Sequence, residues 1–179
     1  MNKRTNFLLM LLAVILAFSA CDDDDSTSPI LLGAEITVTN TLQTAADPSM
    51  GGTGGVETPI ETVFGLAPGS FRLSTAVSNG IEFPGYLDGL YDIDFFENRI
   101  TYNLVAPADH PIYSNFFRTI EANTFDRYYF EFTEAHNIES GSADNSSVNF
   151  SILSDTRILI EIGEGFDFNP GSSFSISLQ

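Results

Sequence analysis

Apolar side chains recur at every second position through most of this chain from residue 35 onward, and this alternation constrains the fold more than any other feature. Alternation of apolar and polar residues is typical of a strand with one buried face, whereas a helix needs a period of about 3.6 residues. Eight such runs follow one another: 36–42, 71–77, 91–95, 100–104, 128–132, 148–152, 158–162 and 174–178. The sequence therefore predicts an all-β fold of antiparallel strands.

Turn-forming residues separate several of these runs. Asn79-Gly80 is a strong two-residue hairpin signal between the runs at 71–77 and 81–83. Glu97-Asn98 is expected to close a second hairpin. Asn169-Pro170-Gly171 places Pro and Gly consecutively, as a type II turn requires.

Residues 30–179 are expected to form one domain, since about 150 residues suit a single hydrophobic core. Many short strands with regular turns favour an antiparallel β-sandwich, of which a jelly roll is one form, and the alternative is a closed lipocalin-like β-barrel. The spacing of Ile112, Phe116, Phe117 and Ile120 predicts one short helix over 112–120. No cysteine follows Cys21, so the domain must be stable without disulfides.

The first residues of the chain have a different character. Lys3 and Arg4 precede an apolar run over 7–18, which ends in small residues before Cys21. This layout is typical of a secretory signal, and the run is shorter than the roughly 20 apolar residues of a membrane span. We expect a signal peptide over 1–20 and an acidic tether over 21–29.

Two motifs in this region resemble known lipoprotein signals. Phe18-Ser19-Ala20-Cys21 resembles the bacterial lipobox, which implies attachment of diacylglycerol to the Cys21 sulfur, cleavage before Cys21 and acylation of its new amino group. Asp22–Asp25 resembles the export signal that Bacteroidota place after the lipidated cysteine of surface lipoproteins. The resemblance implies an outer-membrane lipoprotein that faces the cell exterior, with the periplasmic face as the alternative. Asp25-Ser26-Thr27 matches the O-glycosylation pattern of the same phylum, which makes Ser26 a candidate glycosylation site.

The charge of the chain restricts its partners. It has 24 acidic and 7 basic residues, a formal net charge of −17. Two of the basic residues, Lys3 and Arg4, belong to the expected signal peptide. Such a surface repels phosphate backbones, so nucleic acid is not an expected partner, and attachment to a membrane must come from the lipid anchor.

Catalytic motifs are not evident in the sequence. It has neither a G-x-S-x-G nucleophile motif nor an H-E-x-x-H zinc motif. His110 and His136 are expected in surface or capping roles, and no cofactor is expected.

Four acidic residues form the one candidate for chemistry. Asp92 and Asp94 share a face of one expected strand, and Asp88 and Glu97 flank them. Their oxygens have the chemistry of Ca²⁺ ligands, and paired carboxylates also serve glycoside hydrolysis. The competing interpretation, a solvated strand face, is preferred in a chain this acidic.

Tyr86, Tyr113 and Tyr129 fall outside the expected core positions and are candidates for contact with a sugar or a partner protein. Taken together, these features predict a non-catalytic binding, adhesion or envelope-accessory module. The alternatives are an extracytoplasmic hydrolase that uses acidic residues, or a lipocalin-like carrier of an apolar ligand.

Overall fold

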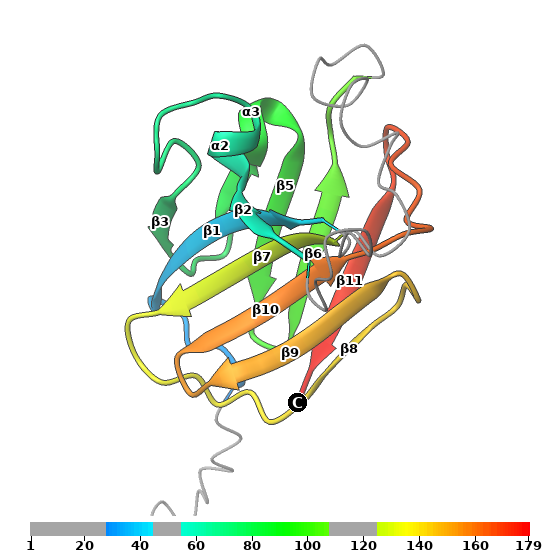
Figure 1. Ribbon diagram of the computed structural model, residues 1–179. Coiled ribbons are helices and arrows are strands. Elements are labelled where there is room, and N and C mark those ends of the chain that lie inside the picture. The colour runs from blue at the N-terminus through cyan, green and yellow to red at the C-terminus, as the bar shows by residue number, and fades with distance from the viewer. Residues whose placement is uncertain (1–27, 45–54, 108–124) are drawn as a thin grey trace, which may run out of the picture.

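The computed structural model describes residues 28–44, 55–107 and 125–179, which form two antiparallel sheets packed face to face (Figure 1). The first sheet contains β1 (Glu35–Gln43), β2 (Glu57–Pro59), β3 (Leu73–Ala76), β7 (Phe125–Phe132), β9 (Val148–Ser154) and β10 (Arg157–Ile162). The second contains β4 (Phe83–Gly85), β5 (Tyr91–Phe96), β6 (Arg99–Leu104), β8 (Gly141–Ala143) and β11 (Ser173–Leu178). Two short helical segments, α2 (Ile60–Val63) and α3 (Tyr86–Gly89), complete the described elements.

The first sheet has the order β2-β1-β7-β10-β9, and β3 also pairs with β1. Strands β2 and β3 occupy successive stretches of β1: β3 pairs with Glu35–Val38, and β2 pairs with Thr41–Gln43. The long ladder between β1 and β7 forms the middle of this sheet. The second sheet has the order β4-β5-β6-β11-β8.

The period-two pattern is confirmed, since each of the eight runs overlaps a strand. On β1, β5, β6, β7 and β11, alternate side chains point between the sheets and are buried. Aromatic rings fill much of this interior: Phe95 and Phe130 have centroids 5.0 Å apart, and Tyr102 stacks on Phe174 at 4.5 Å. The β-sandwich prediction is therefore confirmed.

A closed barrel, the alternative fold, is wrong. Within the described residues no strand pairing joins the two sheets. Strands β8 and β9 lie side by side at one margin but belong to different sheets (Figure 1). Inward-pointing aromatic side chains fill the space between the two sheets. The sheets therefore pack face to face and do not form the continuous wall of a barrel.

One turn prediction is also wrong. Asn79-Gly80 does not close a hairpin, because β3 pairs in the first sheet and β4 in the second. The Glu97-Asn98 hairpin between β5 and β6 is confirmed. So is the type II turn, where Ser172 N–H donates to Asn169 C=O at 2.9 Å and Gly171 has a φ of 85°.

The helix expected over 112–120 lies outside the described residues. None of the helices in the described part of the chain has the length and hydrophobicity to cross a bilayer.

The sandwich has two distinct ends. At one end, the chain before β1 bonds to neighbouring loops, with Ile30 N–H donating to Glu97 C=O at 3.2 Å and Gly33 N–H to Val77 C=O at 2.8 Å. At the other end lie α2 and α3 (Figure 1). Strand β5 runs from one end of the sandwich to the other. Because α3 precedes β5 and Glu97 follows it, α3 and Glu97 lie at opposite ends. We call these the entry end and the helical end.

Candidate ligand-binding groove

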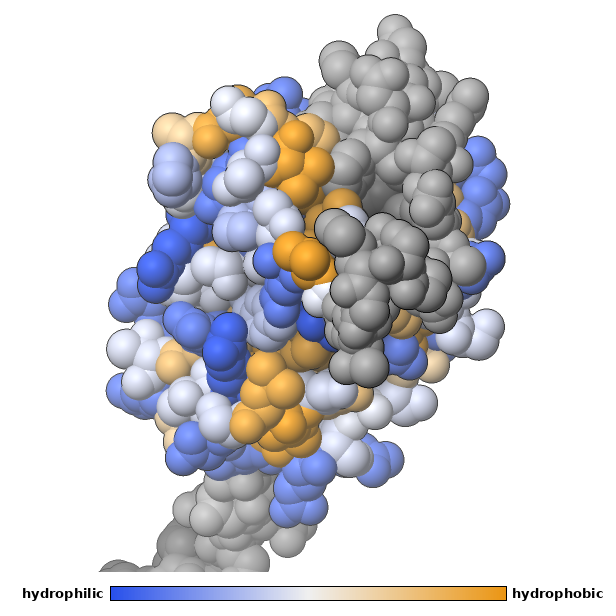
Figure 2. Space-filling view, viewed as in Figure 1, coloured by the Kyte–Doolittle hydropathy of each residue, from blue (hydrophilic) through white to orange (hydrophobic). Residues whose placement is uncertain are grey.

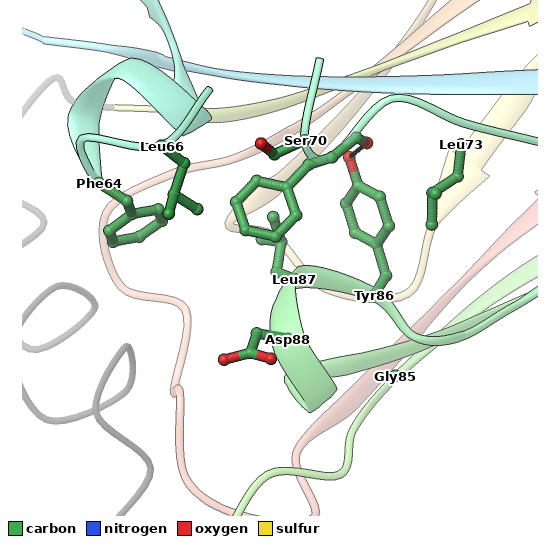
Figure 3. Close-up of a pocket in the computed structure, with 9 residues that line it drawn as sticks. Phe64, Leu66, Ser70, Leu73, Gly85, Tyr86, Leu87 and Asp88 are labelled. Atoms are coloured by element: carbon green, nitrogen blue, oxygen red, sulfur yellow. Dashed lines mark hydrogen bonds between the residues drawn. The ribbon is translucent and has the colours of Figure 1, made fainter. Parts of the chain in front are cut away.

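A groove of about 540 Å³ lies at the helical end, between α3 and the chain that joins α2 to β3 (Figure 3). It is lined by Phe64, Leu66, Ser70, Phe71, Leu73, Gly85, Tyr86, Leu87 and Asp88. Most of these side chains are apolar, and the volume lies within the range of about 300–1,000 Å³ that small-molecule sites occupy. The groove is therefore the first candidate for a binding site.

One wall of the groove is a turn in left-handed backbone conformation. Leu87 has φ 57° and ψ 56°, and Asp88 has φ 59° and ψ 41°. Gly85 and Gly89 on either side also have positive φ, as glycine readily allows. For a bulky residue such as leucine this conformation costs about 1–2 kcal/mol, so α3 is a strained turn and not a regular helix.

Burial and hydrogen bonds hold this turn in place. The Leu87 side chain is buried, which offsets the strain of its backbone. Gly85 N–H donates to Asp92 Oδ1 at 2.8 Å, and the Tyr86 hydroxyl donates to Phe71 C=O at 2.8 Å. Burial raises the pKa of Tyr86, so its hydroxyl stays protonated and keeps this donor role. The turn is thus fastened both to β5 and to the opposite wall.

The opposite wall is built from aromatic rings on the chain after α2. Phe71 lies between Phe64 and Tyr86, with ring centroids 6.4 Å and 6.3 Å away in edge-on arrangements. Glu61 fixes this segment, because its carboxylate accepts the Gly69 N–H at 2.8 Å. Leu66 and Leu73 remain substantially exposed at the rim.

Polar groups are few in the groove. Asp88 is exposed and supplies a carboxylate, and Ser70 uses its hydroxyl to donate to Ala67 C=O at 2.6 Å. An apolar body would fit the walls, while an amine or other donor group would complement Asp88. The arrangement suits binding, and within the described residues no nucleophile with an adjacent base lines it.

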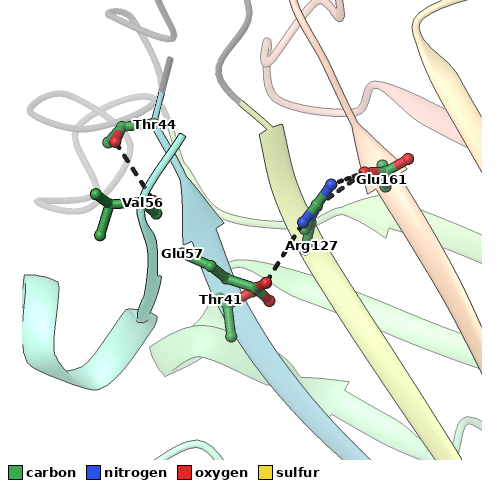
Figure 4. A network of polar contacts seen from close by, with 6 residues as sticks. All are labelled: Thr41, Thr44, Val56, Glu57, Arg127 and Glu161. Atoms are coloured by element: carbon green, nitrogen blue, oxygen red, sulfur yellow. Dashed lines mark hydrogen bonds and ion pairs between the residues drawn. The ribbon is translucent and has the colours of Figure 1, made fainter. Parts of the chain in front are cut away.

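A network of charges positions the strand that leads into α2 (Figure 4). Arg127 on β7 makes ion pairs with Glu161 at 2.6 Å and with Glu57 at 3.4 Å, and Thr41 donates to Glu57 at 2.6 Å. Burial disfavours ionisation of Glu57, but hydrogen bonds from Thr41 and Tyr129 and the charge of Arg127 outweigh it and lower its pKa. The network fastens β2 to the sheet and thereby fixes where α2 begins.

The surface around this network is mainly polar. Figure 2 shows the outer face of the first sheet, where hydrophilic side chains cover much of β1 and β7 and apolar surface gathers both near α2 and over β9 and β10. Val63 and Leu66, which are both exposed, contribute apolar surface at the helical end. The groove lies at the helical end, close to the apolar area near α2.

A second unusual feature is a carboxyl group in the core. Asp126 is fully buried and accepts hydrogen bonds from Asn40 at 2.7 Å and from the Tyr128 hydroxyl at 2.6 Å. Burial raises its pKa to about 6, although both hydrogen bonds act in the opposite direction. The Oδ1 atom of Asn40, also buried, accepts no hydrogen bond from any described residue. These polar groups occupy inward positions of β1 and β7.

The three candidate tyrosines lie in different parts of the chain's structure or outside its described residues. Tyr86 contributes to the groove, where it lies together with Asp88. Tyr129 lies on the outer face of β7, with the Arg157 guanidinium 4.5 Å from its ring centre. Tyr113 lies outside the described residues, as do His110, Ser26 and Cys21.

The four candidate acids are not gathered at one point. Asp92 binds the Gly85 N–H, Asp88 lines the groove, and Glu97 lies in the turn between β5 and β6. Asp94 lies beside Glu82, and burial together with this second carboxyl group raises the pKa of Asp94. Within the described residues no group of three or more His, Cys, Asp or Glu could hold a metal ion.

Glu82 has a structural role beside Asp94. Its carboxylate accepts the Ser78 N–H and the Phe95 N–H, each at 2.7 Å, and so fastens the link between β3 and β4 to β5. These hydrogen bonds, which connect the two sheets, account for the position of Glu82 beside Asp94.

Of the two roles expected for His136, surface or capping, the structure shows a capping role at a buried position. The residue is buried, and its ring lies edge-on to Phe132 at 5.3 Å. Its Nδ1 accepts the Ile138 N–H at 3.2 Å, which is a local capping role. Burial lowers the pKa of His136, so the neutral ring is favoured.

Most groove residues were not recognised from the sequence. Phe64 and Leu66 come from a segment with no regular period. Phe71 begins an alternating run, which predicts a strand but not a place in a groove, and nothing in the sequence indicates the positive φ of Leu87. The available signal was the pair Gly85 and Gly89, which brackets three residues in Gly-Tyr-Leu-Asp-Gly.

Two features thus stand out in the described residues: the groove with its left-handed turn, and the buried Asp126 carboxyl group. Comparisons of the chain with protein-family models, with curated proteins and with solved structures found no match, so neither feature is assigned by similarity.

Proposed function

We propose that this chain is a lipoprotein, anchored through Cys21 and exposed on the outer membrane, whose β-sandwich acts as a non-catalytic binding module. The observation that carries the binding role is the strained turn at Leu87 and Asp88 in the wall of the groove. Strained backbone persists only where its surroundings hold it, and such strain gathers at ligand sites. The position of the groove at the helical end, away from the entry end, supports a site that remains accessible on an anchored protein.

The ligand is proposed to have an apolar body and a cationic or hydrogen-bond-donating end. Phe64, Leu66, Phe71 and Leu87 offer apolar contact to the body. Asp88 offers its carboxylate to the polar end. A peptide segment with neighbouring apolar and basic residues has this chemistry, and so does a small aromatic amine.

The groove is tested with two small probes of the same size and opposite charge. Phenethylamine is expected to raise the melting temperature of the protein more than phenylacetate, in line with the mass-action stabilisation by a ligand of the folded state. Leu66→Arg should abolish the response, because it places a bulky cation at the rim. Leu153→Arg is the matched control, since Leu153 has nearly the same exposure as Leu66 (47% and 46%) but lies on β9. Equal responses to both probes, or an unchanged response in Leu66→Arg, would refute the site.

The anchor is tested separately. The wild-type chain should incorporate a fatty-acid analogue, whereas Cys21→Ser should not and should be released from the membrane or remain unprocessed. Replacement of Asp22–Asp25 by alanine should preserve labelling and reduce cleavage by protease added to intact cells. An unlabelled wild-type chain would contradict the anchor.

A further inference from the structure

The entry end carries exposed apolar side chains. Leu31, Leu32, Ile81 and Phe96 are 41%, 54%, 46% and 40% exposed. Leu32 and Phe96 line the same shallow hollow together with Ser78, and Leu31 lines an adjoining one with Leu32. We call these four side chains the entry-end patch. Ile81 lies two residues after Asn79, which lines the hollow of Leu32 and Phe96. Exposed apolar side chains gathered at one end of a domain mark contact with a partner or a membrane.

Hydrogen bonds hold the segment that bears two of these leucines. Ile30 is buried and its N–H bonds to Glu97 C=O, while the Gly33 N–H bonds to Val77 C=O. Asn137 N–H donates to Pro29 C=O at 3.0 Å. Leu31 and Leu32 therefore protrude from a segment that is fastened to three neighbouring loops.

We propose that the entry-end patch rests on the lipid surface to which the chain is anchored, so that the domain sits on the bilayer with its helical end outward. This inference depends on the proposed lipidation of Cys21. Eight peptide units separate Cys21 from Pro29, which limits their separation to about 30 Å at full extension. The entry end is the part of the domain that such a tether holds nearest to the membrane.

Charge indicates how the contact forms. A chain with net charge −17, and with Glu97 and Glu134 at this end, is not drawn to anionic lipid by its overall field. The contact therefore depends on insertion of apolar side chains among the headgroups, as for amphipathic segments that lie in the interface. Arg99, whose guanidinium lies 4.8 Å from the centre of the Phe96 ring, adds one cation for a lipid phosphate.

The experiment uses the lipidated, full-length mature chain in phosphatidylcholine vesicles. The sequence has no tryptophan, so Phe96→Trp and Ile81→Trp each introduce a single fluorophore into the patch. Leu66→Trp places the same fluorophore at the helical end as the control. With lipids brominated near the headgroup, emission should be lost in both patch variants and retained in Leu66→Trp. Two patch variants are used so that poor folding of one does not decide the outcome.

Flotation of the vesicles separates the test of the lipid anchor from the test of the membrane contact of the entry-end patch. If the protein floats with the vesicles and all three fluorophores are quenched equally, or none is, the membrane contact of the patch is overturned while the anchor stands. If the protein does not float, the anchor fails and the contact fails with it.

Discussion

Asp126 is a carboxyl group that the folded core favours in its protonated form. Its pKa is raised from 3.8 to about 6 by burial, so the folded protein binds this proton more tightly than the unfolded chain does. The stability it contributes is present below pH 4 and is lost as the pH rises through 6, a change of about 3 kcal/mol.

Asp126→Asn should therefore reduce the loss of stability between pH 4 and pH 6, because the amide is neutral throughout and still accepts from Asn40. Urea denaturation across this range provides the measurement. Glu164→Gln removes an exposed carboxylate instead and should leave the slope nearly unchanged. Equal slopes for wild type and Asp126→Asn would contradict the prediction.

Asp88 combines an exposed side chain with a left-handed backbone. Asp88→Gly should destabilise the fold less than the same change at a position with negative φ, since glycine relieves about 1 kcal/mol of backbone strain at position 88. The same change should weaken phenethylamine binding, because the carboxylate is lost. Asp155→Gly is the control: Asp155 is an exposed turn residue without positive φ, so glycine should destabilise the protein there. Thermal melts with and without the amine test both effects.

Single residues also show where sequence reasoning reaches its limit. Asn40 and Asp126 are in phase with the inward apolar residues of their strands, so their burial was open to prediction from the alternation. Their mutual hydrogen bond was not, because it joins residues far apart in the chain. The positive φ of Leu87 was equally hidden, since leucine has no preference for that conformation.

At the scale of elements, β2 is a strand of three residues that depends on contacts beyond its backbone pairing. Arg127→Ala should lower the free energy of unfolding by about 2 kcal/mol, because it leaves Glu161 partly buried without its partner. Arg72→Ala should change it by less than about 0.5 kcal/mol, since Arg72 and Glu131 form a long, exposed pair. Chemical denaturation of both variants measures the difference, and similar effects would show that the network does not stabilise β2.

The long strands were predictable and the short ones were not. A run such as Tyr91–Phe95 alternates over enough residues to define a face, whereas β2, β4 and β8 have three residues each. The misassigned Asn79-Gly80 hairpin has a related cause. Turn residues indicate that the chain reverses direction locally. They do not indicate which sheet the next strand joins, because that depends on long-range pairing.

Across the whole molecule, the dominant electrostatic effect is self-repulsion. With a net charge of −17, the melting temperature should rise with NaCl, because salt screens like charges over a Debye length of about 10 Å at 0.1 M. CaCl₂ at equal ionic strength should add nothing further if Asp88, Asp92 and Asp94 act only as surface charges. A saturable additional shift that Asp92→Asn removes would instead establish a calcium site.

The place of β11 in the second sheet bears on how the chain is made. This strand, the last in the sequence, lies between β6 and β8, and β1 near the start pairs with β7 far along the chain. Neither sheet is complete on a ribosome-bound chain until the later residues have emerged. Loop closure of this length slows folding, so the first half of the chain should stay unfolded while the second half is still being synthesised.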